Sequence, residues 1–341
     1  MLDDLKLIHT RDAQDTLGIA ERQGQQLTHT FKTAQKPVEV DNIVYAAMGG
    51  SALAAILSAS WPGYDIPFQV VRDYDIPAYV SSKTYFIACS YSGNTEETIS
   101  ALEQAEAKGA RIAVITGGGK LAEIAEKKGY PLALLPKAEQ PRYAVFYNLR
   151  ALLTLLEEAG LLKNKDAELS AAVEFLQEAV RAWIPTVPTA DNPAKQIAQE
   201  VIGKSAVVYA GPKLAPAAYK WKISFNENAK HVAWTNQYPE FNHNEFMGWT
   251  KQPPQKPYTV IDLRSSLEHP RTQKRFEVSE RLLSGMRPAP IVVEAEGKTI
   301  LEQLLWTVAL GDFVTLYTAI LNGLNPAPVD LIEKFKKSLD E

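Results

Sequence analysis

The sequence predicts an α/β protein with two mainly parallel sheets, each flanked by helices. Short apolar segments alternate with longer helical patterns along most of the chain. Strands of this kind are buried on both faces, which is typical of a parallel sheet covered by helices. A segment rich in Pro and Thr at 184–189 interrupts the alternation, which then resumes. We therefore expect two similar α/β halves in the chain of 341 residues.

Each expected element follows from an apolar run or a helical period, ended by Gly, Pro or polar residues. In the first half we expect strands at 43–48, 69–71, 84–89, 111–115 and 132–135, and helices at 52–60, 99–107, 120–128, 143–160 and 166–183. In the second half we expect strands at 206–210, 232–234, 259–263 and 291–294, and helices at 193–202, 215–228, 301–321 and 329–339. The corresponding domains are 1–160 and 191–341, joined by a helix and linker at 161–190.

Composition indicates a globular protein that binds neither nucleic acid nor membrane. Apolar residues make up 46% of the chain and charged residues 22%, and the net charge is −4 without a long basic run. The apolar pattern at 301–321 is interrupted by Gly311 and Asp312, which favours a core helix over a membrane span. The single cysteine, Cys89, excludes an intramolecular disulfide, and the first residues do not resemble a signal peptide. We expect a cytoplasmic protein.

A turn rich in hydroxyl groups follows the apolar strand that ends at Cys89. The stretch 90–98 reads Ser-Tyr-Ser-Gly-Asn-Thr-Glu-Glu-Thr and leads into a helix. Free backbone N–H groups at a helix N-terminus attract anions, and the small hydroxyls of Ser90, Ser92 and Thr95 add donors. The alternative is that Ser92 or Thr95 only caps the helix, which also suits the two glutamates. Both interpretations, phosphate binding and capping, follow from the local sequence.

A second turn between a strand and a helix lies at 48–52. Gly49, Gly50 and Ser51 form either a simple tight turn or a second wall of the same phosphate pocket. The segment is neither a Walker A loop nor a G-x-G-x-x-G fingerprint. In open α/β sheets ligands bind beyond the carboxyl ends of the strands, where both turns lie.

Polar residues are concentrated at 225–230 and 239–245. Glu227 and His243 could share a proton-transfer reaction in one pocket, since a carboxylate can abstract a proton next to a carbonyl and a histidine exchanges protons near neutral pH. A metal site at His243 and Glu245 is the competing functional interpretation, although the other histidines lack the usual ligand spacing. A polar loop stabilised by the amides of Asn242 and Asn244 is the structural alternative.

The chain resembles the bifunctional phosphoglucose/phosphomannose isomerases, a family built from two sugar isomerase (SIS) domains. The matching segments run in order across nearly the whole chain. Segments 48–52 and 90–98 are similar to the family's phosphate-binding motifs, 140–142, 227–230 and 239–245 to its active-site motifs, and 311–314 and 325–329 to its C-terminal signature. The sequence departs from the expected family pattern at Ala47, at Ala54-Ala55 and at 143–146.

The resemblance implies interconversion of glucose 6-phosphate and mannose 6-phosphate with fructose 6-phosphate. Glu227 would be the base that moves a proton between C1 and C2 through a cis-enediol(ate). His243, supplied by the other subunit of a homodimer, would open the sugar ring. Arg142 would stabilise the enediolate, as a preorganised cation can. The phosphate of this small-molecule substrate would be held by Gly49, Gly50, Ser51, Ser90, Ser92 and Thr95.

Two further residues match the family less directly. Lys336 corresponds to a lysine near the ring oxygen, and Thr315 to a hydroxyl residue associated with tolerance of either configuration at C2. We expect no cofactor, because the enediol route is redox-neutral, and no metal, because the sequence shows no cluster of metal ligands. The alternatives are a non-catalytic SIS-domain regulator that binds a phosphosugar, and an aminosugar isomerase. The first has no need for Glu227 and His243, and the second normally needs a source of ammonia.

Overall fold

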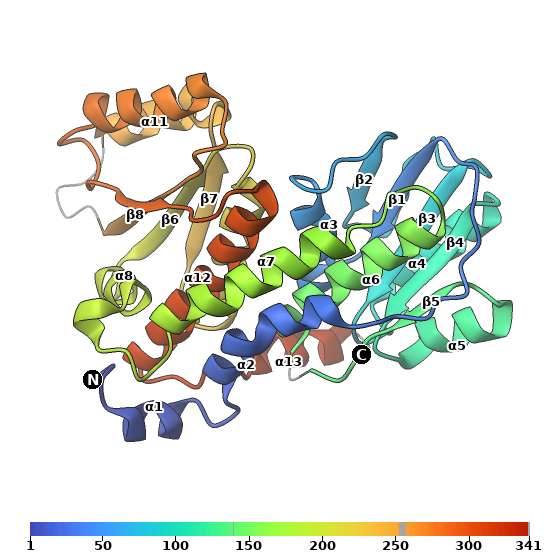
Figure 1. Cartoon of the computed structure of the whole chain (residues 1–341), viewed down its shortest axis with the longest axis horizontal. Helices are drawn as coiled ribbons and strands as arrows, with labels where there is room; N and C mark the ends of the chain where they lie inside the picture. The colour runs from blue at the N-terminus through green and yellow to red at the C-terminus, as the bar shows by residue number, and fades with distance from the viewer. Residues whose placement is uncertain (139, 252–256, 340–341) are drawn as a thin grey trace. The chain divides into compact units, whose positions relative to one another are not determined.

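The computed structural model describes residues 1–138, 140–251 and 257–339, and it divides into two compact units (Figure 1). One unit is Arg22–Glu174, and the other combines Met1–Glu21 with Phe175–Glu341. Each unit contains one parallel sheet with helices on its faces, so the predicted α/β class is confirmed. The short N-terminal helices α1 (Leu5–Arg11) and α2 (Thr16–Arg22), which the sequence did not predict, lie at the start of the chain. The expected domain boundaries stay a prediction.

The sheet of the unit Arg22–Glu174 has five parallel strands in the order β2-β1-β3-β4-β5. Its central strand β3 is buried along its whole length, which explains the continuous apolar run in the sequence. The strands are β1 (Asn42–Ala46), β2 (Phe68–Val71), β3 (Thr84–Ser90), β4 (Arg111–Thr116) and β5 (Leu132–Leu134). The helices are α3 (Gly49–Ser58), α4 (Glu96–Ala107), α5 (Gly119–Lys128) and α6 (Val145–Glu158). Helix α7 (Asp166–Ala179) begins in this unit, and its residues from Phe175 on belong to the other.

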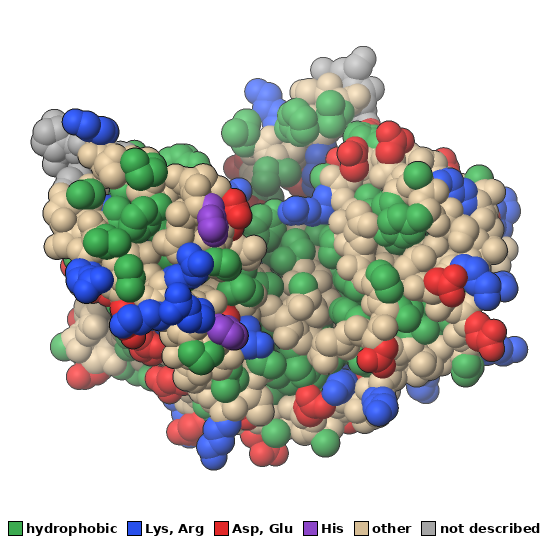
Figure 2. All heavy atoms as spheres, turned by 90° about the horizontal axis from the view of Figure 1, so that it is seen from above, with side chains coloured by type: hydrophobic (Ala, Val, Ile, Leu, Met, Phe, Trp, Pro, Cys, Tyr) green, Lys and Arg blue, Asp and Glu red, His purple; other side chains and the backbone are tan. Residues whose placement is uncertain are grey.

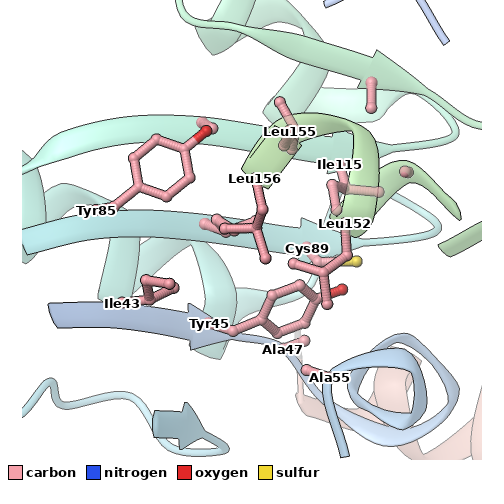
Figure 3. Packing of buried hydrophobic residues seen from close by; sticks show 14 of the residues in the cluster. Ile43, Tyr45, Ala47, Ala55, Tyr85, Cys89, Ile115, Leu152, Leu155 and Leu156 are labelled. Atoms are coloured by element: carbon pink, nitrogen blue, oxygen red, sulfur yellow. The ribbon is translucent and has the colours of Figure 1, made fainter. Parts of the chain in front are cut away.

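Helices cover both faces of this sheet. Small and aliphatic side chains of α3 and α6 pack on one face, and those of α4 and α5 pack on the other. Figure 3 shows the first of these clusters, in which Tyr45, Cys89 and Leu152 lie close together. Burial raises the pKa of the Cys89 thiol to about 12, so the thiol is protonated at neutral pH. Cys89 is therefore a packing residue without thiolate reactivity.

The sheet of the second unit has four parallel strands in the order β7-β6-β8-β9. The strands are β6 (Ser205–Ala210), β7 (Ala233–Gln237), β8 (Tyr258–Arg264) and β9 (Ile291–Glu294). The helices are α8 (Pro193–Val201), α9 (Ala215–Glu227), α10 (Glu245–Gly248), α11 (Pro270–Leu282), α12 (Ile300–Leu321) and α13 (Asp330–Leu339). The aromatic residues of the segment after β7 and of α11 form one apolar cluster on this sheet.

Among the helices that the structure describes, only α12 is long and apolar enough to cross a membrane, and it is buried inside the protein. Thr299 and Glu302 form a capping box at its N-terminus. Asp312 in its middle is paired rather than exposed to an apolar environment. The prediction of a core helix is thus confirmed.

A buried polar network joins α9 to α12. The Lys220 ammonium donates to Asp312 and, at 2.7 Å, to the Ser224 hydroxyl, which donates to Asp312 at 3.0 Å. All three side chains are almost completely buried. Next to them, a Cβ atom on Gly311 would lie 2.2 Å from Nε1 of Trp221, so the close approach of the two helices requires glycine there. This network fixes the register of α9, the helix that ends at Glu227.

Replacement of Asp312 is expected to destabilise the protein strongly. In Asp312→Ala the Lys220 ammonium would lose its buried counter-charge, which costs about 3–5 kcal/mol of unfolding free energy. The exposed pair Glu333–Lys336 provides the control, because Glu333→Ala should cost at most about 1 kcal/mol. Urea denaturation measures both values. Equal losses in the two variants would show that the buried pair contributes no more than a surface pair.

Candidate active site

The turn before α3 is packed directly against the segment that carries Arg142. Gly49 has a left-handed backbone conformation (φ +49°), and a Cβ atom on Gly50 would lie 3.0 Å from the backbone N of Arg142. Glycine at position 50 therefore lets the N-terminus of α3 approach the 3₁₀ helix η2 (Pro141–Tyr143). The structure brings the predicted turn and Arg142 together although they are far apart in the sequence.

The hydroxyl groups of the turn after β3 converge on one another. The Ser90 hydroxyl lies 2.7 Å from that of Thr95 and 3.4 Å from that of Ser92, and it accepts a hydrogen bond from the Gly93 N–H at 3.1 Å. Thr95 occupies the N-cap position of α4, yet its side chain makes no capping hydrogen bond. The capping interpretation therefore does not apply to Thr95. Its hydroxyl belongs to a cluster at the N-terminus of the helix, where an anion is favoured.

A hydrogen bond connects the two turns. The backbone N–H of Tyr91 donates to the Ser51 hydroxyl at 3.0 Å, so the first residues of α3 contact the turn 90–95. Arg142 is 1% exposed, and its guanidinium lies 4.5 Å from the ring centre of Tyr143 and donates to the Tyr143 hydroxyl at 3.2 Å. One unit thus combines small hydroxyl groups, two helix N-termini and a guanidinium at the carboxyl edge of its sheet.

A third turn, Gly117-Gly118-Gly119 after β4, supports the turn 90–95, and the sequence did not predict this role. The Gly117 N–H donates to the Tyr91 carbonyl at 3.0 Å, and the Lys120 N–H donates to Oδ1 of Asn94 at 3.0 Å. A Cβ atom on Gly93 would lie 1.7 Å from the Gly118 carbonyl oxygen. The signal in the sequence was the run of three glycines, which allows two turns to pack backbone against backbone.

Gly93→Ala is expected to weaken binding of a phosphosugar or of inorganic phosphate by roughly 10–100-fold, because overpacking of about 1–3 kcal/mol would displace the turn. Gly129→Ala is the matched control, since Gly129 has nearly the same φ (+70° against +72°) but open space around it. Titration calorimetry with phosphate and phosphosugar measures the affinities. Equal affinities in the two variants would mean that the contact with Gly118 does not shape the binding turn.

Glu227 lies in the other unit, as the last residue of α9. The next residue, Asn228, donates to the Thr315 hydroxyl at 3.0 Å, and Thr315 in turn donates to the Gly311 carbonyl at 2.9 Å. Lys230, which has a left-handed backbone (φ +52°), donates to the carbonyls of Asn325 and Pro326 at 3.1 Å. The segments 227–230 and 325–329, predicted separately from the sequence, are therefore in contact around the end of α9.

His243 lies beyond the opposite ends of the strands of the same sheet. The end of α9 is next to the start of β6, because the imidazole of His231 contacts the Lys204 carbonyl. The segment that carries His243 begins next to the end of β6, where the Tyr238 N–H donates to the Ala210 carbonyl at 2.9 Å. The six residues of β6 separate these points by about 17 Å. Along this sheet, the backbones of Glu227 and His243 of one chain are therefore well separated.

The remaining predicted residues have the following surroundings. The Lys336 side chain is 60% exposed and forms an ion pair with Glu333 at 2.9 Å on α13, while Thr315 is completely buried. The proposed ligand Glu245 accepts hydrogen bonds from Tyr209 and, at 2.7 Å, from Asn236. Among the described residues there is no group of three or more His, Cys, Asp or Glu side chains able to hold a metal ion.

Comparisons with known proteins agree with both units. Residues 38–159 match the SIS domain, and residues 190–339 match the bacterial phospho-glucose isomerase C-terminal SIS domain. A bifunctional phosphoglucose/phosphomannose isomerase of Caldicellulosiruptor bescii is 36% identical over 90% of this chain and 91% of its own. A D-glucosamine-6-phosphate 4-epimerase of Sulfolobus acidocaldarius is 36% identical, over 65% of this chain and 66% of its own.

Among solved structures, the fold is similar to that of a glucose-6-phosphate isomerase-like protein from Thermus thermophilus. The TM-score is 0.66 at 19% identity, with 98% of each chain covered. At this identity the likeness concerns the fold alone. The two domain matches and the similarity over nine-tenths of the chain identify the family: the chain belongs to the bifunctional phosphoglucose/phosphomannose isomerases, with two SIS domains.

Proposed function

We propose that the protein is an aldose–ketose isomerase that interconverts glucose 6-phosphate and mannose 6-phosphate with fructose 6-phosphate. The observation that carries the proposal is the set of Ser51, Ser90, Thr95 and Arg142 at one sheet edge. This set offers neutral donors for a phosphate and a cation for developing negative charge. The family relationship favours a sugar phosphate as the anion.

In the proposed reaction, the Glu227 carboxylate removes the proton from C2 of the open-chain aldose and returns it to C1. The oxygen substituents exchange carbonyl and hydroxyl character through a cis-enediol(ate), whose negative charge Arg142 stabilises. His243 transfers the proton that opens the sugar ring before this step. The reaction is redox-neutral, so it needs no hydride or electron carrier, and we propose that it proceeds without a metal.

We further propose that the active enzyme is a homodimer in which His243 comes from the other subunit. The topology supports this arrangement, since the end of α9 and the segment that carries His243 lie at opposite ends of the strands of one sheet. A second copy can bring its own His243 to Glu227 across a two-fold axis. We propose a cytoplasmic enzyme, consistent with a single cysteine, Cys89, which cannot form an intramolecular disulfide.

Thr315 and Lys336 remain predictions within this proposal. The hydrogen bond between Thr315 and Asn228, the neighbour of the proposed base, supports a place for Thr315 near C1 and C2 of the substrate. The ion pair of Lys336 with Glu333 would have to open for Lys336 to reach the ring oxygen.

A proton NMR time course with fructose 6-phosphate in D₂O containing EDTA tests the proposed function. We expect glucose 6-phosphate and mannose 6-phosphate to appear, both with deuterium at C2. Binding of fructose 6-phosphate without turnover would favour the non-catalytic regulator. A parallel sample with glucosamine 6-phosphate tests for the 4-epimerase, because inversion at C4 changes the ring proton couplings.

A further inference from the structure

We propose that Arg275 and Ser279 of α11 are positioning residues for His243 and that they act through the side chain of Asn242. This inference rests on the proposed role of His243 in ring opening. Neither the resemblance nor the sequence pattern pointed to α11, whose Phe276 packs in the apolar cluster with Tyr238 and Phe241. Figure 2 looks down on α11 and shows Lys and Arg side chains on the surface over this helix.

Both ends of the Asn242 amide are held by α11. The Asn242 side-chain nitrogen donates to the Ser279 hydroxyl at 2.8 Å, and Nη1 of Arg275 donates to the Asn242 side-chain oxygen at 3.1 Å. Ser279 is 1% exposed, so water could not replace its hydroxyl as the hydrogen-bond acceptor of the Asn242 amide if that hydroxyl were removed. These two bonds fix the rotamer of Asn242 and thereby the backbone just before His243.

The segment is also anchored on either side of Asn242 and His243. Phe241 is completely buried, with its ring centre 4.6 Å from that of Tyr209 and 5.0 Å from that of Tyr238. Glu245 accepts hydrogen bonds from Tyr209 and Asn236. Burial and the hydrogen bond to Glu245 raise the pKa of Tyr209, so the phenol stays protonated and donates.

His243 itself is exposed, and its imidazole forms no hydrogen bond with another residue in the described part of the chain. Its place is therefore set by the backbone on either side. A proton-transfer group has to lie within hydrogen-bond distance of the ring oxygen, and a displacement of about 1 Å can lower the rate about 10²-fold. Arg275 and Ser279 thus contribute to catalysis by positioning His243, in addition to any contribution to the stability of the protein.

Two substrates separate positioning from general structure. Fructose 6-phosphate exists mainly as a furanose and needs ring opening. 5-Deoxyfructose 6-phosphate cannot close that ring, because it lacks the 5-hydroxyl, so its isomerisation bypasses His243. The variants are Arg275→Met and Ser279→Ala, with Ser279→Thr as the conservative change that keeps the hydroxyl. Arg271→Met is the matched control, because Arg271 is exposed near the start of the same helix, one turn before Arg275.

We expect kcat for fructose 6-phosphate to fall by roughly 10–100-fold in Arg275→Met and Ser279→Ala, with KM nearly unchanged. Turnover of the 5-deoxy substrate should stay within about twofold of the wild type. Ser279→Thr should recover part of the loss, and Arg271→Met should behave as wild type. Equal losses on both substrates, or no loss on either, would overturn the proposal.

Hydrogen exchange tests the same inference without catalysis. Amide exchange at 240–245 should increase in Arg275→Met and Ser279→Ala and remain unchanged in Arg271→Met. Unchanged exchange would contradict the proposal that Arg275 and Ser279 hold Asn242 and the backbone before His243. A further outcome is that the wild type turns over neither substrate while the variants still show these exchange differences. That result would disprove the proposed function and the role of Arg275 and Ser279 in catalysis, but not their contacts with Asn242.

Discussion

Glu227→Gln is expected to lower kcat for fructose 6-phosphate by at least about 10²–10⁴-fold, the usual contribution of a general base. The amide has nearly the same size and hydrogen-bonding capacity as the carboxylate but cannot accept a proton at neutral pH. Binding should survive, because the proposed phosphate ligands Ser51, Ser90 and Thr95 belong to the other unit. Deuterium incorporation at C2 should be lost together with turnover.

Glu174→Gln provides the control, since Glu174 is exposed on α7 and the change in side chain is identical. Coupled-enzyme rates give kcat, and titration calorimetry with a phosphosugar gives the affinity. If Glu227→Gln keeps wild-type turnover, another group must be the base. If it loses affinity and turnover together, Glu227 supports the structure of the site instead of transferring the proton.

The sequence predicted well those elements whose buried residues are apolar, because burial then leaves a visible apolar pattern in the sequence. Strand β9 was predicted with its observed bounds, and the other strands of both sheets were predicted within a few residues. Strand β7 extends to Gln237, further than expected, because its polar end pairs by backbone hydrogen bonds at the edge of the sheet. Helix α11 was missed because two of its three buried residues, Thr272 and Ser279, are polar and show no apolar period.

The site was predictable where glycine and hydroxyl residues mark a turn, and less so where backbone packing decides. The turns at 49–51 and 90–95 followed from local chemistry, whereas their contacts with Arg142 and with Gly118 depend on the fold. Glu227 and His243 were paired on their proton-transfer chemistry, and the sequence did not show whether they meet within one chain or across two. The parallel strand β7 lies between them and carries the chain from the amino ends of the strands to their carboxyl ends.

Mixing two inactive variants is expected to restore activity. Glu227→Gln and His243→Asn should each be nearly inactive alone. If His243 acts in the neighbouring subunit, a mixed dimer has one site with both groups intact. Random association of equal amounts gives about half mixed dimers, so the mixture should reach about a quarter of wild-type activity. The physical reason is the separation of about 17 Å along β6 between the end of α9 and the segment that carries His243.

The reverse mixture, of wild type with the double variant Glu227→Gln/His243→Asn, gives an independent reading of the same geometry. Mixed dimers then contain no complete site if His243 acts across the interface, and one complete site if it acts within its own chain. Activity should therefore fall to about a quarter of the wild type in the first case and to about a half in the second. Native mass spectrometry verifies that the chains have exchanged. Activity of about a half, with no recovery when the single variants are mixed, would place His243 and Glu227 of one chain in the same site, despite the length of strand that separates their backbones.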